Sequence, residues 1–204
     1  MPQTFSMRAL GKGSLASFMK AVLGIVWVVL WIAAAALALG SAGYLCLMIL
    51  IGAGIVPMDV LEVGDATINL GPVTIQAEND DRLVLPVVAP ALLASAVAVG
   101  GALIIVARLR KLFANFTSGE PFSADNASHL RVIWITMLVM ELSRYAIAAI
   151  IVVLVAVFGT PETTEIEIQA PVNLMTWGAI FVLIVLAEVF REGARLKEEQ
   201  ELTI

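Results

Sequence analysis

The sequence has few of the residues that most catalytic or metal sites require. Its 204 residues include one cysteine and one histidine, and only 14% are charged. A single cysteine, Cys46, excludes an intrachain disulfide, and one cysteine with one histidine cannot supply a zinc ligand set. The zinc-protease, nucleophile-elbow, phosphate-loop and dinucleotide patterns are absent too. We therefore expect no enzymatic activity, no metal and no cofactor, and His129 is expected to be an interfacial residue.

Charge is scarce because apolar residues make up 60% of the chain, and the mean hydropathy is +0.97. The net charge of −5 argues against direct nucleic-acid binding. Four apolar runs are long enough to cross a bilayer, which needs about 20 residues each. The predicted spans cover residues 21–50, 84–107, 132–158 and 171–190. The connecting parts are outer loops at 57–82 and 159–170, a cytoplasmic hairpin at 108–131 and a cytoplasmic tail at 191–204.

The distribution of charge predicts the orientation of these spans. Ten of the twelve Lys and Arg residues fall on the side that holds both termini, whereas the other side holds nine acids and only Arg82. Lys and Arg in short loops stay on the cytoplasmic side. The sequence therefore predicts a multi-pass protein with both termini in the cytoplasm, forming a single membrane domain over residues 1–204.

Both outer loops contain segments in which polar and apolar residues alternate. These segments are residues 67–70, 73–77 and 164–169, and such alternation is typical of a half-buried strand. The expected fold class is an all-α membrane protein, a four-helix transmembrane bundle with a small extracytoplasmic β-sheet cap. The inner face of that sheet is predicted to hold Ile68, Leu70, Val73, Ile75, Ile166 and Ile168. The acidic run at 78–81 lacks the spacing of a calcium loop.

Two charged residues, Glu141 and Arg144, lie inside the third predicted span. Their separation of three residues places them on nearly the same helix face, where they can pair. Three interpretations stay open. The pair fixes which face of the helix points into the bundle, it senses a ligand or a proton, or it lines a transport path. A four-span chain without an inverted repeat is small for a transporter.

The cytoplasmic hairpin and tail contain the candidate residues for binding a partner. In the hairpin, apolar residues recur at helical spacing from Leu109 to Phe116, and Gly119 and Pro121 then stop the helix. The tail is expected to extend the fourth span as a charged helix. The candidate partner-binding residues are Arg110, Phe113, Gly119, Glu120, Pro121, Phe122, Arg191, Glu192, Gly193, Leu196, Glu199, Leu202 and Ile204.

Five short motifs in these two segments resemble one bacterial membrane family. They are LRKLF at 109–113, SGEPFS at 118–123, AEVFREG at 187–193, LKEEQ at 196–200 and LTI at 202–204. Together they resemble the family called domain of unknown function 2975. The resemblance implies a four-span protein of the bacterial inner membrane. It also implies a cytoplasmic partner, because similar proteins often have a neighbouring gene for a small helix-turn-helix transcription regulator.

Three functions follow from these patterns. The first is a non-enzymatic membrane regulator or scaffold that binds a cytoplasmic partner, and the second is a small transporter or channel that uses Glu141 and Arg144. The third is a structural subunit of a larger complex. Rows of small residues, such as Ala36 with Gly40 and Ala96 with Gly100, allow close helix packing within the monomer or in a homo-oligomer.

Overall fold

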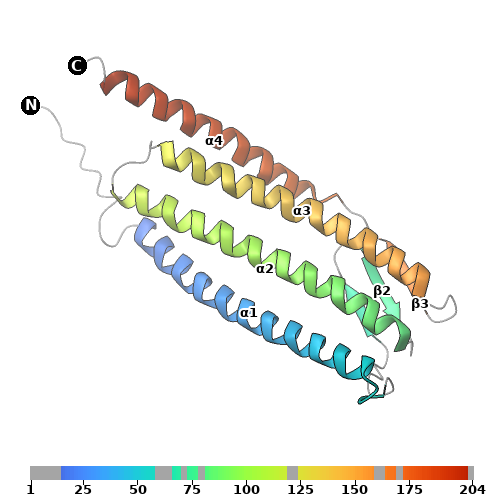
Figure 1. Ribbon diagram of the computed structural model, residues 1–204. Coiled ribbons are helices and arrows are strands. Elements are labelled where there is room, and N and C mark those ends of the chain that lie inside the picture. The colour runs from blue at the N-terminus through green and yellow to red at the C-terminus, as the bar shows by residue number, and fades with distance from the viewer. Residues whose placement is uncertain are drawn as a thin grey trace, which may run out of the picture. The chain divides into compact units, whose positions relative to one another are not determined.

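Four long helices dominate the computed structural model (Figure 1), which describes residues 15–57, 66–69, 73–77, 81–118, 124–158, 164–168 and 172–201. Three short strands lie between the helices in the sequence. In chain order the elements are α1 (Leu15–Gly52), β1 (Ala66–Asn69), β2 (Val73–Ala77), α2 (Asp81–Ser118), α3 (Ala124–Phe158), β3 (Thr164–Ile168) and α4 (Leu174–Glu201).

The chain divides into two compact units, and the helices α1, α2 and α3 each contribute to both. The first unit contains Met1–Ile32, Gly101–Leu138 and Leu174–Ile204, and the second contains Ala33–Gly100 and Val139–Asn173. Of the Lys and Arg residues assigned to the cytoplasmic side, those that the structure describes all fall within the first unit. We call the part of this unit where α2, α3 and α4 meet, around Leu112, Leu130 and Ala187, the basic end.

Each helix contains a segment apolar enough to cross a membrane. These segments are Phe18–Gly52, Val88–Phe116, Asp125–Val157 and Leu174–Gln200, and they are 27 to 35 residues long. At about 1.5 Å per residue each is at least about 40 Å long, which exceeds a hydrocarbon core of about 30 Å. The chain is therefore a multi-pass membrane protein whose helices have room to extend into the interface.

The first helix ends at a glycine cap. Gly54 has a φ of +70°, a conformation that glycine adopts without the steric cost that other residues incur. The amide of Ile55 donates to the carbonyl of Leu50 at 3.0 Å, and the amide of Gly54 donates to that of Ile51 at 2.9 Å. These two bonds form a Schellman cap, which satisfies carbonyls that the helix leaves open. The helix itself ends at Gly52, two residues beyond the predicted span at 21–50.

Hydroxyl groups inside the apolar helices bond to the backbone of their own helix. Ser41 donates to the carbonyl of Leu37 at 2.8 Å, and Thr136 donates to that of Val132 at 2.7 Å. A polar group in lipid has no water to bond to, so a local acceptor removes most of its cost. These residues therefore require no partner helix.

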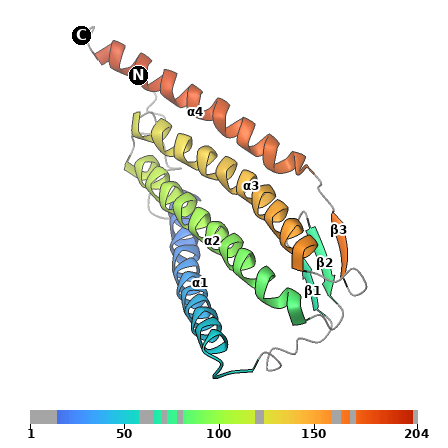
Figure 2. The ribbon, with the colours of Figure 1, turned by 45° about the vertical axis from the view of Figure 1, so that its right-hand side comes forward.

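The strands form an antiparallel sheet in the order β1-β2-β3, with Ile68 opposite Ile75 and Ile75 opposite Ile166. They have four or five residues each, against 28 to 38 for the helices. Figure 2 shows them beside the ends of α2 and α3, away from the end of α1. The side chains predicted for the inner face of the sheet lie outside the part whose side chains the structure describes.

The fold class that included a β-sheet cap is therefore wrong. The fold is all-α, with four candidate membrane-spanning helices. Alternation over four or five residues is a local signal, and strands of that length bring too few side chains to cover a helical bundle. The sequence pattern predicted the antiparallel pairing that the three strands show, and wrongly extended it to a layer that covers the bundle.

In the first unit, Leu112, Leu130 and Ala187 form a core cluster. By contrast, α1 exposes most of its apolar side chains, with Ile25 67% exposed. The predicted rows of small residues make no close approach in the described chain, because a Cβ placed at Gly40 or Gly100 would have open space around it. The surface that these helices present to lipid or to other chains is thus large and apolar.

Leu130→Ala should lower the thermal stability of the protein in detergent. Leu130 is 2% exposed, so its truncation leaves a cavity, and Leu→Ala at buried sites costs about 2–5 kcal/mol. The control is Leu142→Ala on the same helix, because Leu142 is 53% exposed. Melting temperature followed by circular dichroism should fall for Leu130→Ala and stay nearly unchanged for Leu142→Ala. Equal shifts would contradict the assigned core.

Candidate functional site

The candidate site is the basic end, where α2, α3 and α4 contact one another. Around the core cluster, half-buried apolar side chains pack from all three helices: Leu109, Phe116, Trp134, Leu183 and Phe190. The helical spacing predicted from Leu109 to Phe116 accounts for the α2 contribution, since residues three and four apart share a face. This cluster holds the hairpin and α4 together as one body.

A polar pair lies next to this apolar cluster. The amide nitrogen of Asn115 on α2 donates to the side-chain oxygen of Asn126 on α3 at 2.8 Å. Asn126 is fully buried. An unpaired buried amide costs about 1–3 kcal/mol, so the bond strongly favours the one register of α2 against α3 that preserves it. The pair therefore specifies how the hairpin closes.

Aromatic rings connect α2 with α4. The Phe116 and Phe190 rings are stacked, with centroids 6.2 Å apart and planes inclined by 29°. Phe113 meets Phe116 edge to face at 6.0 Å. Offset-stacked and edge-to-face geometries are the favourable ones for aromatic pairs. Phe113, predicted as a partner-binding residue, is half-buried against Phe116.

Arg110 connects the basic end to α1. Its guanidinium carbon lies 5.4 Å from the centroid of the Trp27 ring, and Trp27 meets Trp31 edge to face. A cation over an indole face is stabilised by about 0.5–1 kcal/mol at an exposed site. Arg110, predicted as a partner-binding residue, thus lies against α1 of its own chain.

The end of α4 is a charged, exposed helix. Arg195 pairs with Glu192 at 3.2 Å and with Glu199 at 3.3 Å, while Arg191 pairs with Glu188. All these side chains are 47% exposed or more, so each pair contributes little to stability. Leu196 is 50% exposed among them, which leaves one apolar side chain in a charged surface.

The predicted partner-binding residues thus have different environments. Phe113 and Arg110 contact their own chain, and Gly193 is half-buried. The exposed candidates on α4 are Arg191, Glu192, Leu196 and Glu199. The remaining predicted residues lie outside the described part of the chain: Gly119, Glu120, Pro121, Phe122, Leu202 and Ile204. The exposed candidates that the structure brings together are on α4.

His129 lies on α3 before the predicted apolar span at 132–158. Its Nδ1 is buried without a hydrogen-bond partner among the described residues.

The second unit contains the predicted intramembrane pair. Arg144 Nη2 lies 3.1 Å from Glu141 Oε1, and Glu141 is 6% exposed. Tyr145, which sequence reasoning missed, donates its hydroxyl to the same carboxylate oxygen at 3.3 Å, and the Arg144 guanidinium lies over its ring. All three side chains come from α3. The buried carboxylate is thus paired and hydrogen-bonded by residues of its own helix.

Several important contacts could not be found from the sequence. The Asn115–Asn126 bond and the Phe116–Phe190 stack join residues on different helices, and no local spacing marks them. One signal was present for Tyr145, because it follows Glu141 by four residues and shares its helix face. A second signal, for the Asn115–Asn126 bond, was the polar side chain of Asn115 next to the apolar row of α2.

Residues 73–204 match a family described as "Protein of unknown function (DUF2975)". The chain belongs to this family. The match confirms the resemblance predicted from the hairpin and tail motifs, and it includes every contact of the basic end except that of Trp27. No curated protein and no solved structure matches the chain. Family membership supports a membrane protein with four apolar helices.

Removing Glu141 should destabilise the protein more than removing Arg144. Without Arg144, the carboxyl group of Glu141 can take up a proton and become neutral, whereas arginine keeps its charge in proteins. Glu141→Leu should cost about 3 kcal/mol, and Arg144→Met less. Thermal melting in detergent compares the two variants.

The double variant Glu141→Leu/Arg144→Met separates a structural pair from two independent residues. With both charges removed, the protein should be more stable than Glu141→Leu alone, because no unpaired charge remains in the membrane. A double variant less stable than either single variant would contradict this structural interpretation.

Proposed function

We propose that this protein is a non-enzymatic regulator or scaffold of the bacterial inner membrane, with both termini in the cytoplasm. In this proposal the end of α4 binds a soluble cytoplasmic protein, and the hairpin of α2 and α3 holds α4 in place. The cluster of Leu112, Leu130 and Ala187 supports the second part, because it packs α4 on the hairpin.

The observation that carries the proposal is the surface of α4 beyond the predicted span at 171–190. Leu196 is half exposed there, and the charged residues around it are of both signs: Glu192, Arg195, Lys197, Glu198 and Glu199. An apolar side chain surrounded by charged groups of both signs is a common composition of a protein interface, with an apolar centre and a polar rim.

The partner is expected to be a small protein that presents an apolar pocket for Leu196 and charges complementary to α4. The family resemblance implies a helix-turn-helix transcription regulator, which the membrane protein would hold away from DNA. Because the charges on α4 are exposed and of both signs, they are suited to specificity and association rate more than to affinity. We therefore expect binding to weaken as salt concentration rises.

The alternative function, a transporter or channel that uses Glu141 and Arg144, has less support. The contacts of the Glu141 carboxylate come from Arg144 and Tyr145 of the same helix. A pair satisfied within one helix can be explained by the cost of burial alone, so it supports the structural interpretation. Flux through proteoliposomes that changes in Glu141→Gln would instead favour transport.

Leu196→Asp should abolish capture of the cytoplasmic partner. The tagged full-length protein is purified in mild detergent from the cells that naturally express it, and co-purifying proteins are identified by mass spectrometry. The expected result is a stoichiometric small DNA-binding protein, lost in Leu196→Asp and in a chain that ends before Leu196. An added charge at an interface centre is costly because it must be desolvated.

The matched control is Phe181→Ala, which changes an exposed apolar residue in the apolar part of α4. This variant should capture the partner as well as the wild type does. Recovery of the chain alone, or capture unchanged in Leu196→Asp, would contradict the proposal. Loss of capture in both variants would indicate damage to α4 instead of a contact at its end.

A further inference from the structure

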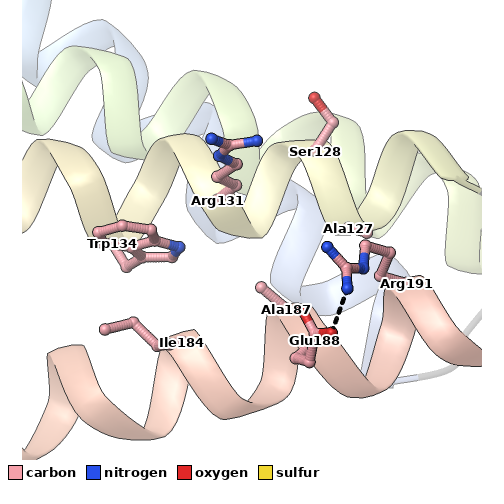
Figure 3. A pocket seen from close by; sticks show the side chains of 8 residues that line it. All are labelled: Ala127, Ser128, Arg131, Trp134, Ile184, Ala187, Glu188 and Arg191. Atoms are coloured by element: carbon pink, nitrogen blue, oxygen red, sulfur yellow. Dashed lines mark hydrogen bonds and ion pairs between the residues drawn. The ribbon is translucent and has the colours of Figure 1, made fainter.

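A pocket of about 440 Å³ lies between α3 and α4 within the first unit (Figure 3). From α3 it is lined by Ser128, Arg131 and Trp134, and from α4 by residues between Ile184 and Arg191. Figure 3 shows the Arg191 guanidinium between the two helices, with its contact to Glu188. This volume is within the range of small-molecule sites, which is about 300–1,000 Å³.

The charged groups of the pocket favour an anion. Two arginines, Arg131 and Arg191, line it together with one acid, Glu188. In the described part of the chain no acid forms an ion pair with Arg131, which is exposed. The pair of Arg191 with Glu188 has side chains 71% and 59% exposed, so it is weak and can exchange. Figure 3 shows the Ser128 hydroxyl pointing away from α4, so a phosphate group between the helices would have the Arg191 guanidinium as its first donor, and the long, exposed side chain of Arg131 can turn to supply a second.

The other lining residues favour a ligand that also has an apolar part. Ala187 and Ile184 continue the wall toward the uncharged part of α4, and Ile184 is 40% exposed there. Trp134 stands on the opposite wall, and tryptophan is enriched where a membrane meets water. The polar and apolar ends of the pocket thus follow the change from charged residues to the apolar run along α4.

We propose that this pocket binds the head group of an anionic phospholipid, with Arg131 and Arg191 contacting its phosphate and Ile184 contacting its acyl chain. The commitment to a lipid follows from the continuity of the pocket with the membrane-spanning part of α4. Basic pockets between membrane helices are known to bind anionic lipid head groups. The proposal does not depend on the partner-binding function of the α4 end.

Glu188 gives this site a counter-ion of its own. When the lipid is absent, Glu188 pairs with Arg191, and the lipid phosphate replaces it as the partner of that arginine. Removal of the Glu188 charge should therefore increase affinity for the anionic lipid, the opposite of the effect expected for either arginine. A merely structural role of these residues would not produce changes of opposite sign.

The test is a titration of the purified full-length protein, with bound lipid counted by native mass spectrometry. The probes are dioctanoyl phosphatidylglycerol, dioctanoyl phosphatidylcholine and inorganic phosphate. We expect the anionic lipid to bind at least about fivefold tighter than the zwitterionic one, and Arg131→Gln and Arg191→Gln each to weaken it about fivefold. Glu188→Gln should tighten it, and Arg195→Gln is the control, because Arg195 does not line this pocket.

Equal binding of the two lipids by the wild-type protein would overturn the proposal without any variant. Unchanged affinity in both arginine variants would also overturn it, as would an equal loss in Arg195→Gln, which would indicate nonspecific attraction. Inorganic phosphate that displaces the lipid at a similar concentration would show that the acyl chain adds nothing, and the lipid assignment would then be wrong. Gel filtration checks that each variant remains folded.

Discussion

The structure depends on the packing of the basic end, because a bilayer gives apolar helices little reason to associate. Lipid tails are as apolar as leucine side chains, so helices gain from one another mainly through close packing and polar contacts. Both occur where α2, α3 and α4 meet, in the cluster around Leu130 and in the bond between Asn115 and Asn126. Elsewhere, large stretches of the helices remain exposed, on α1 in particular.

The proposed binding sites lie in a different unit from the buried Glu141–Arg144 pair. The pair at Glu141 lies in the second unit, whereas the lipid pocket and the charged end of α4 lie in the first. Arg191 lines the pocket and is near the surface proposed for the partner, since Leu196 follows it by little more than one turn. Lipid binding and partner binding are therefore expected to influence each other, because each ligand would favour one arrangement of the α4 side chains.

The sequence predicted what depends on local pattern. Uncharged runs marked the helices, and a separation of three residues marked the contact of Glu141 with Arg144. It did not predict Arg110 against Trp27, which joins two helices distant in sequence. The β-sheet cap was wrong because alternation is a property of a few neighbouring residues, whereas a cap requires those residues to cover distant helix ends.

The bond between Asn115 and Asn126 also has a consequence for the order of assembly. The two residues are eleven positions apart, so this contact can form soon after the first turns of α3 leave the ribosome. The stack of Phe116 on Phe190 must wait until more than half of α4 has been synthesised. During biogenesis the hairpin is therefore expected to close first and to provide a preformed surface onto which the last helix docks as the translocon releases it.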